Sequence, residues 1–146
     1  MYTLYFSPGS CSLIVNCLLE ELRVPFELKR VDLEAKEHHG EAYRQLNPKG
    51  KVPVLATPEG PLTECMALVE YLCDRHDGER RWLPAPGTWG RARALERIAT
   101  LPTPVHNDLF NRFFHADAFS GDPHVQQEVK ARAGEKLVEY FAGEDA

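Results

Sequence analysis

The turn Pro8-Gly-Ser-Cys-Ser12 contains the residue best suited to chemistry, the thiol of Cys11. The turn lies between a strand pattern and a helical pattern, so Cys11 should stand at a helix N-terminus. Free N–H groups and the helix dipole stabilise a thiolate there, so we expect the pKa of Cys11 to be lowered. Gly9 lets a ligand approach the backbone closely. The alternative is a small residue that only closes a tight turn, and Ser10 and Ser12 are candidates for hydroxyl donation or helix capping.

A second candidate feature is the segment Asn47-Pro-Lys-Gly-Lys-Val-Pro-Val-Leu55. Its apolar, β-prone end enters a sheet at Pro53, which leaves the N–H and C=O of Val52 free to pair with another group. Thr63 and Glu64 then precede a helical run whose first N–H groups form an anion site. A ligand that has both a peptide bond and a carboxylate suits this combination.

The composition excludes several functional classes. The 146 residues are enough for one ordinary domain, or one small domain and part of a second, and 43% are hydrophobic and 27% charged. The net charge of −5 lacks the basic excess of a nucleic-acid-binding protein. No apolar run is long enough to span a membrane, and the N-terminus lacks the basic start of a signal peptide. We therefore expect a cytoplasmic protein with neither nucleic acid nor membrane as partner.

The cysteine and histidine spacing predicts no metal site. The four cysteines are Cys11, Cys17, Cys65 and Cys73, and none forms a C-x-x-C pair. Four free thiols are the expectation in a reducing cytosol, with Cys17 and Cys73 packed in the core from apolar helix faces. The pair His38-His39 has no third ligand nearby and is interpreted as a polar loop.

The hydrophobic periodicity of the first half predicts a βαβ-αββα order. Strand, helix and strand follow each other within about thirty residues, as in a right-handed parallel βαβ unit. The first helix should bury a stripe of Ile14, Cys17, Leu18 and Leu22. The expected elements are a strand Tyr2–Phe6, a helix from Cys11 or Ser12 to Leu22, a strand Phe26–Leu33, a short helix Glu41–Leu46, a hairpin turning at Pro58–Pro61 and a helix from about residue 64.

The pattern after residue 77 is helical only. We assign residues 1–77 to one domain, 78–89 to a linker and 90–146 to a partial helical domain. The expected helices are Arg91–Thr100, Val105–Phe119 and Val125–Phe141, with a kink or break at Pro102 and Pro104. Arg91, Arg93 and Arg97 are expected on a solvated face. Phe110, Phe113, Phe114 and Phe119 are expected in a core, with the wall of a substrate site as the alternative.

Together these stretches resemble the glutathione S-transferases, especially the bacterial beta class, from Met1 to about Leu137. The motifs are Pro8-Gly-Ser-Cys-Ser12, Asn47-Pro-Lys-Gly-Lys-Val-Pro53, Thr63-Glu64 before a helix ending in Glu70-Tyr-Leu72, and Leu83-Pro84 in the linker. Each motif alone is weak, but four of them in the right order are a specific signal. The resemblance implies an α/β thioredoxin-like domain that binds glutathione, followed by an all-α domain that covers a hydrophobic substrate.

The resemblance also implies roles for single residues. It implies that Pro53 is cis and that the Val52 backbone pairs with the cysteinyl part of glutathione. Glu64, with the N–H of Cys65, would hold the γ-glutamyl end. Lys36 would reach the glycyl carboxylate, and His106 would face the cysteine.

Several positions depart from the family pattern. Cys65 stands where a serine is usual, so glutathione is held by a weaker donor or a second reactive thiol is present. Ala99 replaces a frequent asparagine and Phe6 a frequent tyrosine. The helical domain is expected to be incomplete, which would leave apolar helix faces uncovered.

We therefore predict a glutathione transferase in which Cys11, assisted by His106, acts on glutathione as co-substrate, with Ser10, Lys36, Val52, Pro53, Glu64 and Cys65 forming the glutathione site. The reaction would be conjugation to a small electrophile, thiol–disulfide exchange, or both. The expected assembly is a homodimer. The alternative is a binding or interaction module without catalysis, because a fold does not define an activity.

Overall fold

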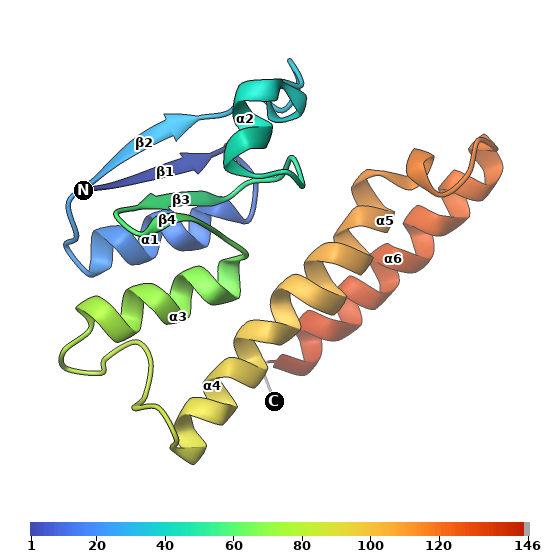
Figure 1. The fold of residues 1–146 in the computed structure, drawn as a ribbon. Helices are drawn as coiled ribbons and strands as arrows, with labels where there is room; N and C mark the ends of the chain where they lie inside the picture. The colour runs from blue at the N-terminus through green and yellow to red at the C-terminus, as the bar shows by residue number, and fades with distance from the viewer. Residues whose placement is uncertain (145–146) are drawn as a thin grey trace. The chain divides into compact units, whose positions relative to one another are not determined.

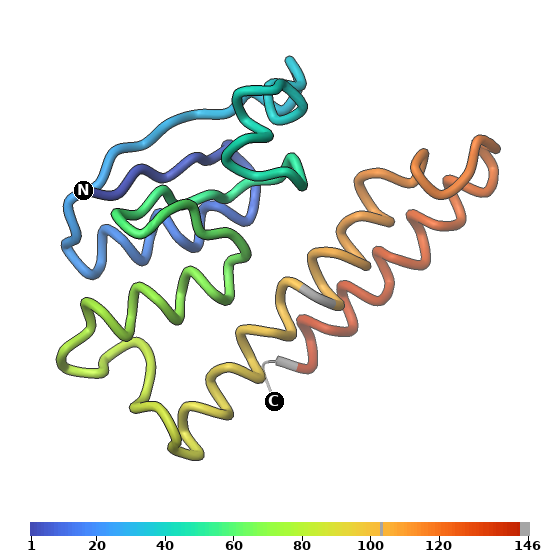
Figure 2. Tube along the Cα trace, viewed as in Figure 1, coloured from blue at the N-terminus to red at the C-terminus, as the bar shows by residue number. Residues whose placement is uncertain are grey.

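The computed structural model describes residues 1–144, so the last two residues of the expected range 90–146 lie outside it (Figure 1, Figure 2). The chain divides into two compact units, residues 1–95 and the residues from 96 onward. The first unit combines a sheet with helices, and the second contains helices only, in the part of the chain that is described.

The first unit is built on a four-stranded sheet with the order β2-β1-β3-β4. Strand β1 pairs parallel with β2 and antiparallel with β3, through Leu4 opposite Leu28 and Leu55. The last two strands form the expected hairpin, with Thr57 opposite Gly60. This mixed sheet confirms the thioredoxin-like prediction. The strands are β1 Tyr2–Phe6, β2 Phe26–Arg30, β3 Val54–Thr57 and β4 Gly60–Thr63.

Helices α1 (Ser12–Glu21) and α3 (Cys65–His76) pack against each other below the sheet in Figure 1. Leu4, Leu19, Leu55, Leu68 and Leu72 are fully buried between these layers. Helix α2 (Glu41–Leu46) follows a short 3-10 turn η1 (Glu37–His39), and its Tyr43 packs in a cluster with Val31 and Val54. Every predicted element of this unit is present, although β2 ends at Arg30, three residues earlier than expected.

The predicted buried stripe of α1 was wrong for Ile14 and Cys17, which are both exposed. The rotation of the helix follows Ser12, which is 1% exposed because its hydroxyl bonds to the Ser7 backbone. With Ser12 inside, the helical period brings Val15, Leu18 and Leu19 inward and turns Cys17 to the solvent. Cys73 on α3 is buried, as predicted.

The arginine prediction for helix α4 (Trp89–Thr100) was also wrong at Arg91, which is 4% exposed. Its guanidinium donates to both carboxylate oxygens of Asp74, at 2.9 and 2.8 Å, and to Glu70 at 2.9 Å. It also donates to the carbonyl of Pro84 at 3.0 Å. A buried charge is tolerated because these acceptors compensate for its lost hydration.

The second unit begins within α4 and contains the helices that follow it, and its prolines do not break the helical course of the chain. Pro102 and Pro104 lie in a π-helical segment η2 (Leu101–Phe110), where wider turns accommodate the missing N–H and the proline ring. Helix α5 (Asn111–Phe114) ends at Phe114, because the backbone of His115 leaves the helical region, so the predicted helix to Phe119 was too long. A 3-10 turn η3 (Ala116–Ala118) leads to α6 (Pro123–Glu144).

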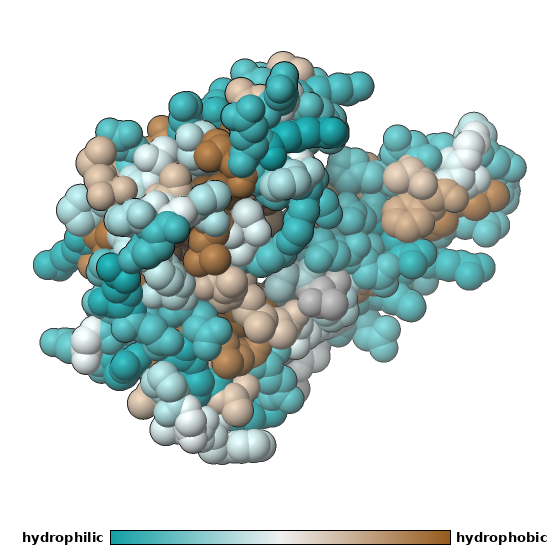
Figure 3. Space-filling model, viewed as in Figure 1, coloured by the Kyte–Doolittle hydropathy of each residue, from teal (hydrophilic) through white to brown (hydrophobic). Residues whose placement is uncertain are grey.

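The phenylalanines of this unit are not a core. Phe113, Phe114 and Phe119 are exposed, Phe114 by 63%, and Phe110 is half-buried. The buried residues in the described part of this unit are Val105, Ala116, Ala133 and Leu137. The Phe113 ring packs with its edge on Gly134 of α6, where a Cβ would lie 3.3 Å from it. Figure 3 shows apolar side chains gathered near α5 and the turn after it. Of the described helices, none has the length and apolar character to cross a membrane.

The Arg91 cluster generates the first prediction, for Asp74→Asn. Its hydrogen bonds from Arg91, and then those from Arg80, hold the pKa of the Asp74 carboxyl below its usual value. Removing the charge should lower the free energy of unfolding at neutral pH by about 1–3 kcal/mol. A carboxyl with a depressed folded pKa stabilises the fold above its unfolded pKa and loses that contribution as the pH falls through the folded value.

The measurement is urea unfolding of wild type and Asp74→Asn between neutral pH and strongly acidic pH. The stability difference should shrink as the pH falls below about 4, the usual range of a carboxyl. The exposed Glu27→Gln is the matched control and should change little. A difference that persists unchanged in acid would contradict the electrostatic origin.

Candidate active site at the start of helix α1

The turn between β1 and α1 is held by its own serines. The Ser10 hydroxyl donates to the Ser7 carbonyl at 2.8 Å and lies 2.6 Å from the Ser12 hydroxyl. It also accepts the Ser12 backbone N–H at 3.3 Å, so it satisfies one free donor at the helix start. Gly9 has a φ of +72°, which a residue with a side chain rarely adopts. Of the two hydroxyls, only that of half-buried Ser10 stays near the surface, because Ser12 is buried.

Cys11 occupies the N-cap position of α1 and is half-buried. Its thiol points toward the Val52 carbonyl, with Sγ 3.7 Å from that oxygen. The pKa of Cys11 is lowered to about 7, chiefly by a hydrogen bond from the Cys65 thiol, while burial acts in the opposite direction. Its own backbone N–H and Lys51 lower the pKa further. The predicted lowering is confirmed, but a neighbouring thiol contributes more than the helix end does.

Cys65, the first residue of α3, is the partner that the sequence could not connect to Cys11. Its thiol has two acceptors within reach, the Cys11 carbonyl oxygen at 3.6 Å and the Cys11 sulfur. The pKa of Cys65 is raised, first by the hydrogen bond to Cys11 and then by burial and the charge of Cys11. Cys65 therefore keeps its proton, and Cys11 is the thiol of the pair that ionises first.

The loop before β3 presents the backbone of Val52 beside Cys11. The Val52–Pro53 peptide bond is cis, as the family resemblance predicted. The Lys51 carbonyl accepts hydrogen bonds from the Tyr43 hydroxyl at 2.9 Å and from the Asn47 amide at 2.7 Å. Among the described residues, no protein acceptor is found for the Val52 N–H. The side chain of Val52 is half-buried, and its backbone remains available to a ligand.

Gly50 lets this loop lie against the preceding one. A Cβ at Gly50 would stand 2.9 Å from the His38 carbonyl oxygen, and its φ is +61°. The rings of His38 and His39, which are tilted by 45° to each other, therefore lie against the turn that leads to Val52, with exposed Lys36 just before them. The described residues contain no group of three metal-binding side chains, and these histidines act as packing for the loop.

Glu64 lies at the N-terminus of α3 with a φ of +71°, which is unusual for a residue with a side chain. Its carboxylate accepts a hydrogen bond of 2.7 Å from the Lys49 ammonium, and both side chains are largely exposed. The pair joins the Asn47–Lys51 loop to the start of α3. Sequence reasoning missed Lys49, because nothing local connects residues 15 positions apart.

The structure thus brings most of the candidates together within the first unit. Cys11 contacts Val52 and Cys65, Ser10 and Pro53 are their sequence neighbours, and Glu64 precedes Cys65. Lys36 belongs to the loop beside Gly50. His106 lies in η2 of the other unit, where its ring makes an edge contact with Phe110, so its role beside Cys11 stays a prediction.

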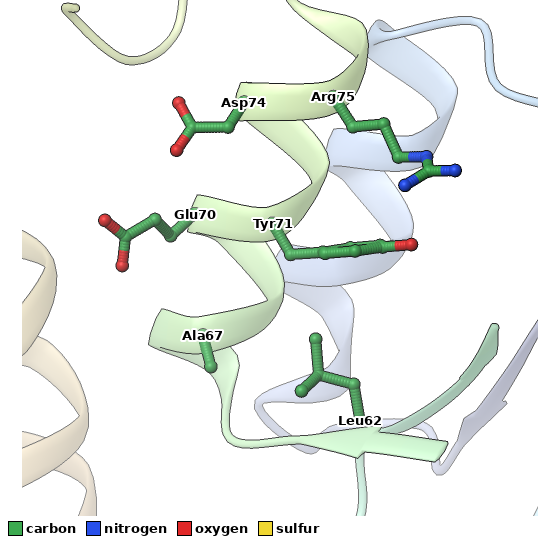
Figure 4. A pocket seen from close by; sticks show the side chains of 6 residues that line it. All are labelled: Leu62, Ala67, Glu70, Tyr71, Asp74 and Arg75. Carbon is green, nitrogen blue, oxygen red and sulfur yellow. The ribbon is translucent and has the colours of Figure 1, made fainter. Parts of the chain in front are cut away.

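A separate hollow on the surface of α3 shares no residue with this site. Figure 4 shows Glu70 and Asp74 on one side of α3 and Tyr71 and Arg75 on the other. Tyr71 donates to Glu59 at 2.9 Å, and Glu59 also pairs with Arg75. The lining is thus engaged in internal contacts. The hollow is lined by Leu62, Ala67, Glu70, Tyr71, Asp74 and Arg75.

Comparison with known proteins agrees with this arrangement. Residues 1–74 match the family model described as glutathione S-transferase, N-terminal domain. The chain is 34% identical over 116 residues to glutathione S-transferase GstA of Escherichia coli O157:H7, covering 78% of this chain and 57% of that protein. It is 32% identical over 146 residues to glutathione S-transferase GST-4.5 of Xanthomonas campestris, covering 98% of this chain and 68% of that protein.

A solved sphingomonad glutathione S-transferase complexed with glutathione is similar to this chain, with a TM-score of 0.82 and 34% identity. The match covers 98% of this chain and 68% of that one. A bacterial beta class enzyme of Sphingomonas chungbukensis has a TM-score of 0.80 at 29% identity, covering 97% of this chain and 69% of that one. This chain belongs to the glutathione S-transferase family. It spans about half the length of the first curated relatives it matches.

The pKa of Cys11 predicts that it is the most reactive thiol near neutral pH. Labelling with iodoacetamide should modify Cys11 first, with a rate that rises through a midpoint near pH 7 because the thiolate is the nucleophile. Peptide mapping by mass spectrometry gives the site and the rate. Cys17 is the internal control, since it is exposed but lies away from the α1 N-terminus. Faster labelling of Cys17 at pH 7 would contradict the proposed activation of Cys11.

Proposed function

We propose that this chain acts as a glutathione transferase, with Cys11 at the reacting centre and glutathione as co-substrate. The observation that carries the proposal is the Cys11 thiol, with its pKa lowered to about 7, beside the Val52 carbonyl ahead of a cis proline. An extended tripeptide needs backbone groups to pair with, and Val52 offers an N–H and a C=O. The similar structures crystallised with glutathione support this choice of ligand.

The charged groups at the two ends of glutathione would determine where those ends bind. Its γ-glutamyl ammonium would bind the Glu64 carboxylate, and its γ-glutamyl carboxylate would accept N–H groups at the start of α3, beginning with Cys65. Its glycyl carboxylate would lie toward Lys36. The ammonium must replace Lys49 at Glu64, and an exposed ion pair of this kind is worth only about 0–1 kcal/mol, so the exchange is easy.

Two reactions use the same placement. In conjugation, the protonated form of the Cys11 thiol, or a nearby hydroxyl, donates a hydrogen bond to the glutathione thiolate, which attacks an electrophilic carbon as the leaving group departs. In thiol–disulfide exchange, the Cys11 thiolate attacks glutathione disulfide, forms a mixed disulfide and releases one glutathione thiolate. His106 is proposed to assist from the helical unit. For the conjugation reaction, the proposed substrate is a hydrophobic electrophile and the proposed process is detoxification. The four free cysteines favour a location in the reducing cytoplasm.

The first experiment separates an enzyme from a binding module. Isothermal titration with glutathione measures binding, and initial rates with an activated aryl chloride and with a small disulfide measure the two reactions. Cys11→Ala should bind glutathione but lose disulfide exchange. Binding without turnover in either assay would favour the non-catalytic alternative, and absence of binding would overturn the proposal.

The Glu64 carboxylate gives a sharper prediction about recognition. Glu64→Gln should weaken glutathione binding about tenfold, since an ammonium loses its counter-charge at a partly exposed site, worth about 1.4 kcal/mol. Lys49→Met should leave binding equal or slightly tighter, because the competing cation is gone. Glu27→Gln on β2 is the control, and Glu70 is unsuitable because it binds Arg91. If Lys49→Met binds glutathione more weakly than the wild type, Lys49 itself contacts the ligand.

A homodimer is proposed from the apolar surface of the helical unit. Phe114 is 63% exposed and Val138 is 72% exposed, and large apolar side chains gain roughly 1.5–3 kcal/mol each when they are buried. Twofold pairing is the commonest way to cover such residues. Sedimentation at micromolar concentration should show a dimer of the 16.5 kDa chain. A monomer that binds no hydrophobic dye would contradict the proposal. The exposed set in this unit is Leu101, Phe113, Phe114, Phe119, Val125, Val138 and Phe141.

A further inference from the structure

The contact between Cys11 and Cys65 joins two thiols from helices that lie far apart in the sequence. Helices α1 and α3 pack together and bring their N-termini to the same point. The Cys65 sulfur lies 3.6 Å from the carbonyl oxygen of Cys11 and makes a hydrogen bond to its thiol. Both residues are half-buried, so neither is sealed away from a small reactant. Of the other two cysteines, Cys17 is exposed and Cys73 is buried.

We propose that Cys65 is a resolving thiol, which displaces glutathione from Cys11 and closes an intramolecular Cys11–Cys65 disulfide. The inference rests on the proposed function, because glutathione disulfide is the oxidant. In the first step the Cys11 thiolate attacks glutathione disulfide and one glutathione thiolate leaves. In the second step the Cys65 sulfur attacks Cys11, its proton passes to the departing glutathione thiolate, and the protein disulfide forms. In sum, a protein dithiol and one glutathione disulfide become a protein disulfide and two glutathione thiols.

The protonation states of Cys11 and Cys65 determine which of the two thiols reacts first. Before reaction Cys11 carries the charge and Cys65 holds its proton, so Cys11 attacks first. The raised pKa of Cys65 comes first from its hydrogen bond to Cys11, then from burial and the charge of Cys11. The mixed disulfide removes both the charge and the thiolate acceptor. The pKa of Cys65 then falls, and its sulfur becomes nucleophilic beside the bond that it must break.

The test compares Cys65→Ser and Cys11→Ser with the unchanged pair, all in a Cys17→Ser background that removes the exposed thiol. Each protein is treated with glutathione disulfide, quenched in acid, and analysed by intact mass and peptide mapping. The unchanged pair should lose two hydrogens and show a Cys11–Cys65 cross-link. Cys65→Ser should instead gain one glutathionyl group at Cys11, and Cys11→Ser should show neither product. A glutathionyl adduct that persists equally with and without Cys65 overturns the inference while the proposed function stands.

A second arm uses diamide, which oxidises neighbouring thiols to a disulfide without glutathione. Formation of the Cys11–Cys65 cross-link, with loss of both free thiols, supports the pairing. Absence of this cross-link in diamide overturns it. If diamide closes the disulfide but glutathione disulfide leaves Cys65→Ser unmodified, the dithiol stands and the proposed glutathione chemistry fails.

Discussion

The Lys51 carbonyl, which accepts one hydrogen bond from Tyr43 and one from Asn47, holds the loop on which the candidate site depends. Asn47 is 3% exposed, and its side-chain oxygen accepts the Lys49 N–H as well, so one buried amide fixes both ends of the turn. A buried polar group of this kind is retained because leaving its partners unpaired would cost about 1–3 kcal/mol each. The result is a rigid approach to the cis peptide bond at Pro53, with Val52 facing Cys11.

The site has polar groups with two separate tasks. Ser7, Ser10 and Ser12 bond to each other and hold the turn, so they supply shape and little free hydrogen-bonding capacity. The Cys11 thiol and the Glu64 carboxylate, in contrast, remain accessible to a ligand. The position of Ser12 next to Cys11 in the sequence made it a candidate for activating glutathione. Because its hydroxyl is buried and bonded within the turn, Ser12 is a poor candidate in the structure.

The presence of cysteine at position 65 changes the chemistry of the site and not its fold. A hydroxyl there could donate a hydrogen bond to Cys11, but only a thiol can also exchange with a disulfide. The same contact that lowers the pKa of Cys11 therefore gives this chain a second sulfur within the site.

The sequence by itself determined the order of the elements in the first unit, because strand alternation, helical period and turn residues such as Gly9 act over a few neighbouring positions. It also placed Cys11 at a helix start and, through the family motif, Pro53 in the cis form. Only the tertiary structure decided the rotation of α1, the burial of Arg91 and the pairing of Cys11 with Cys65, 54 positions apart. These depend on which helix faces meet, and a local pattern carries no information about a partner that distant in the chain.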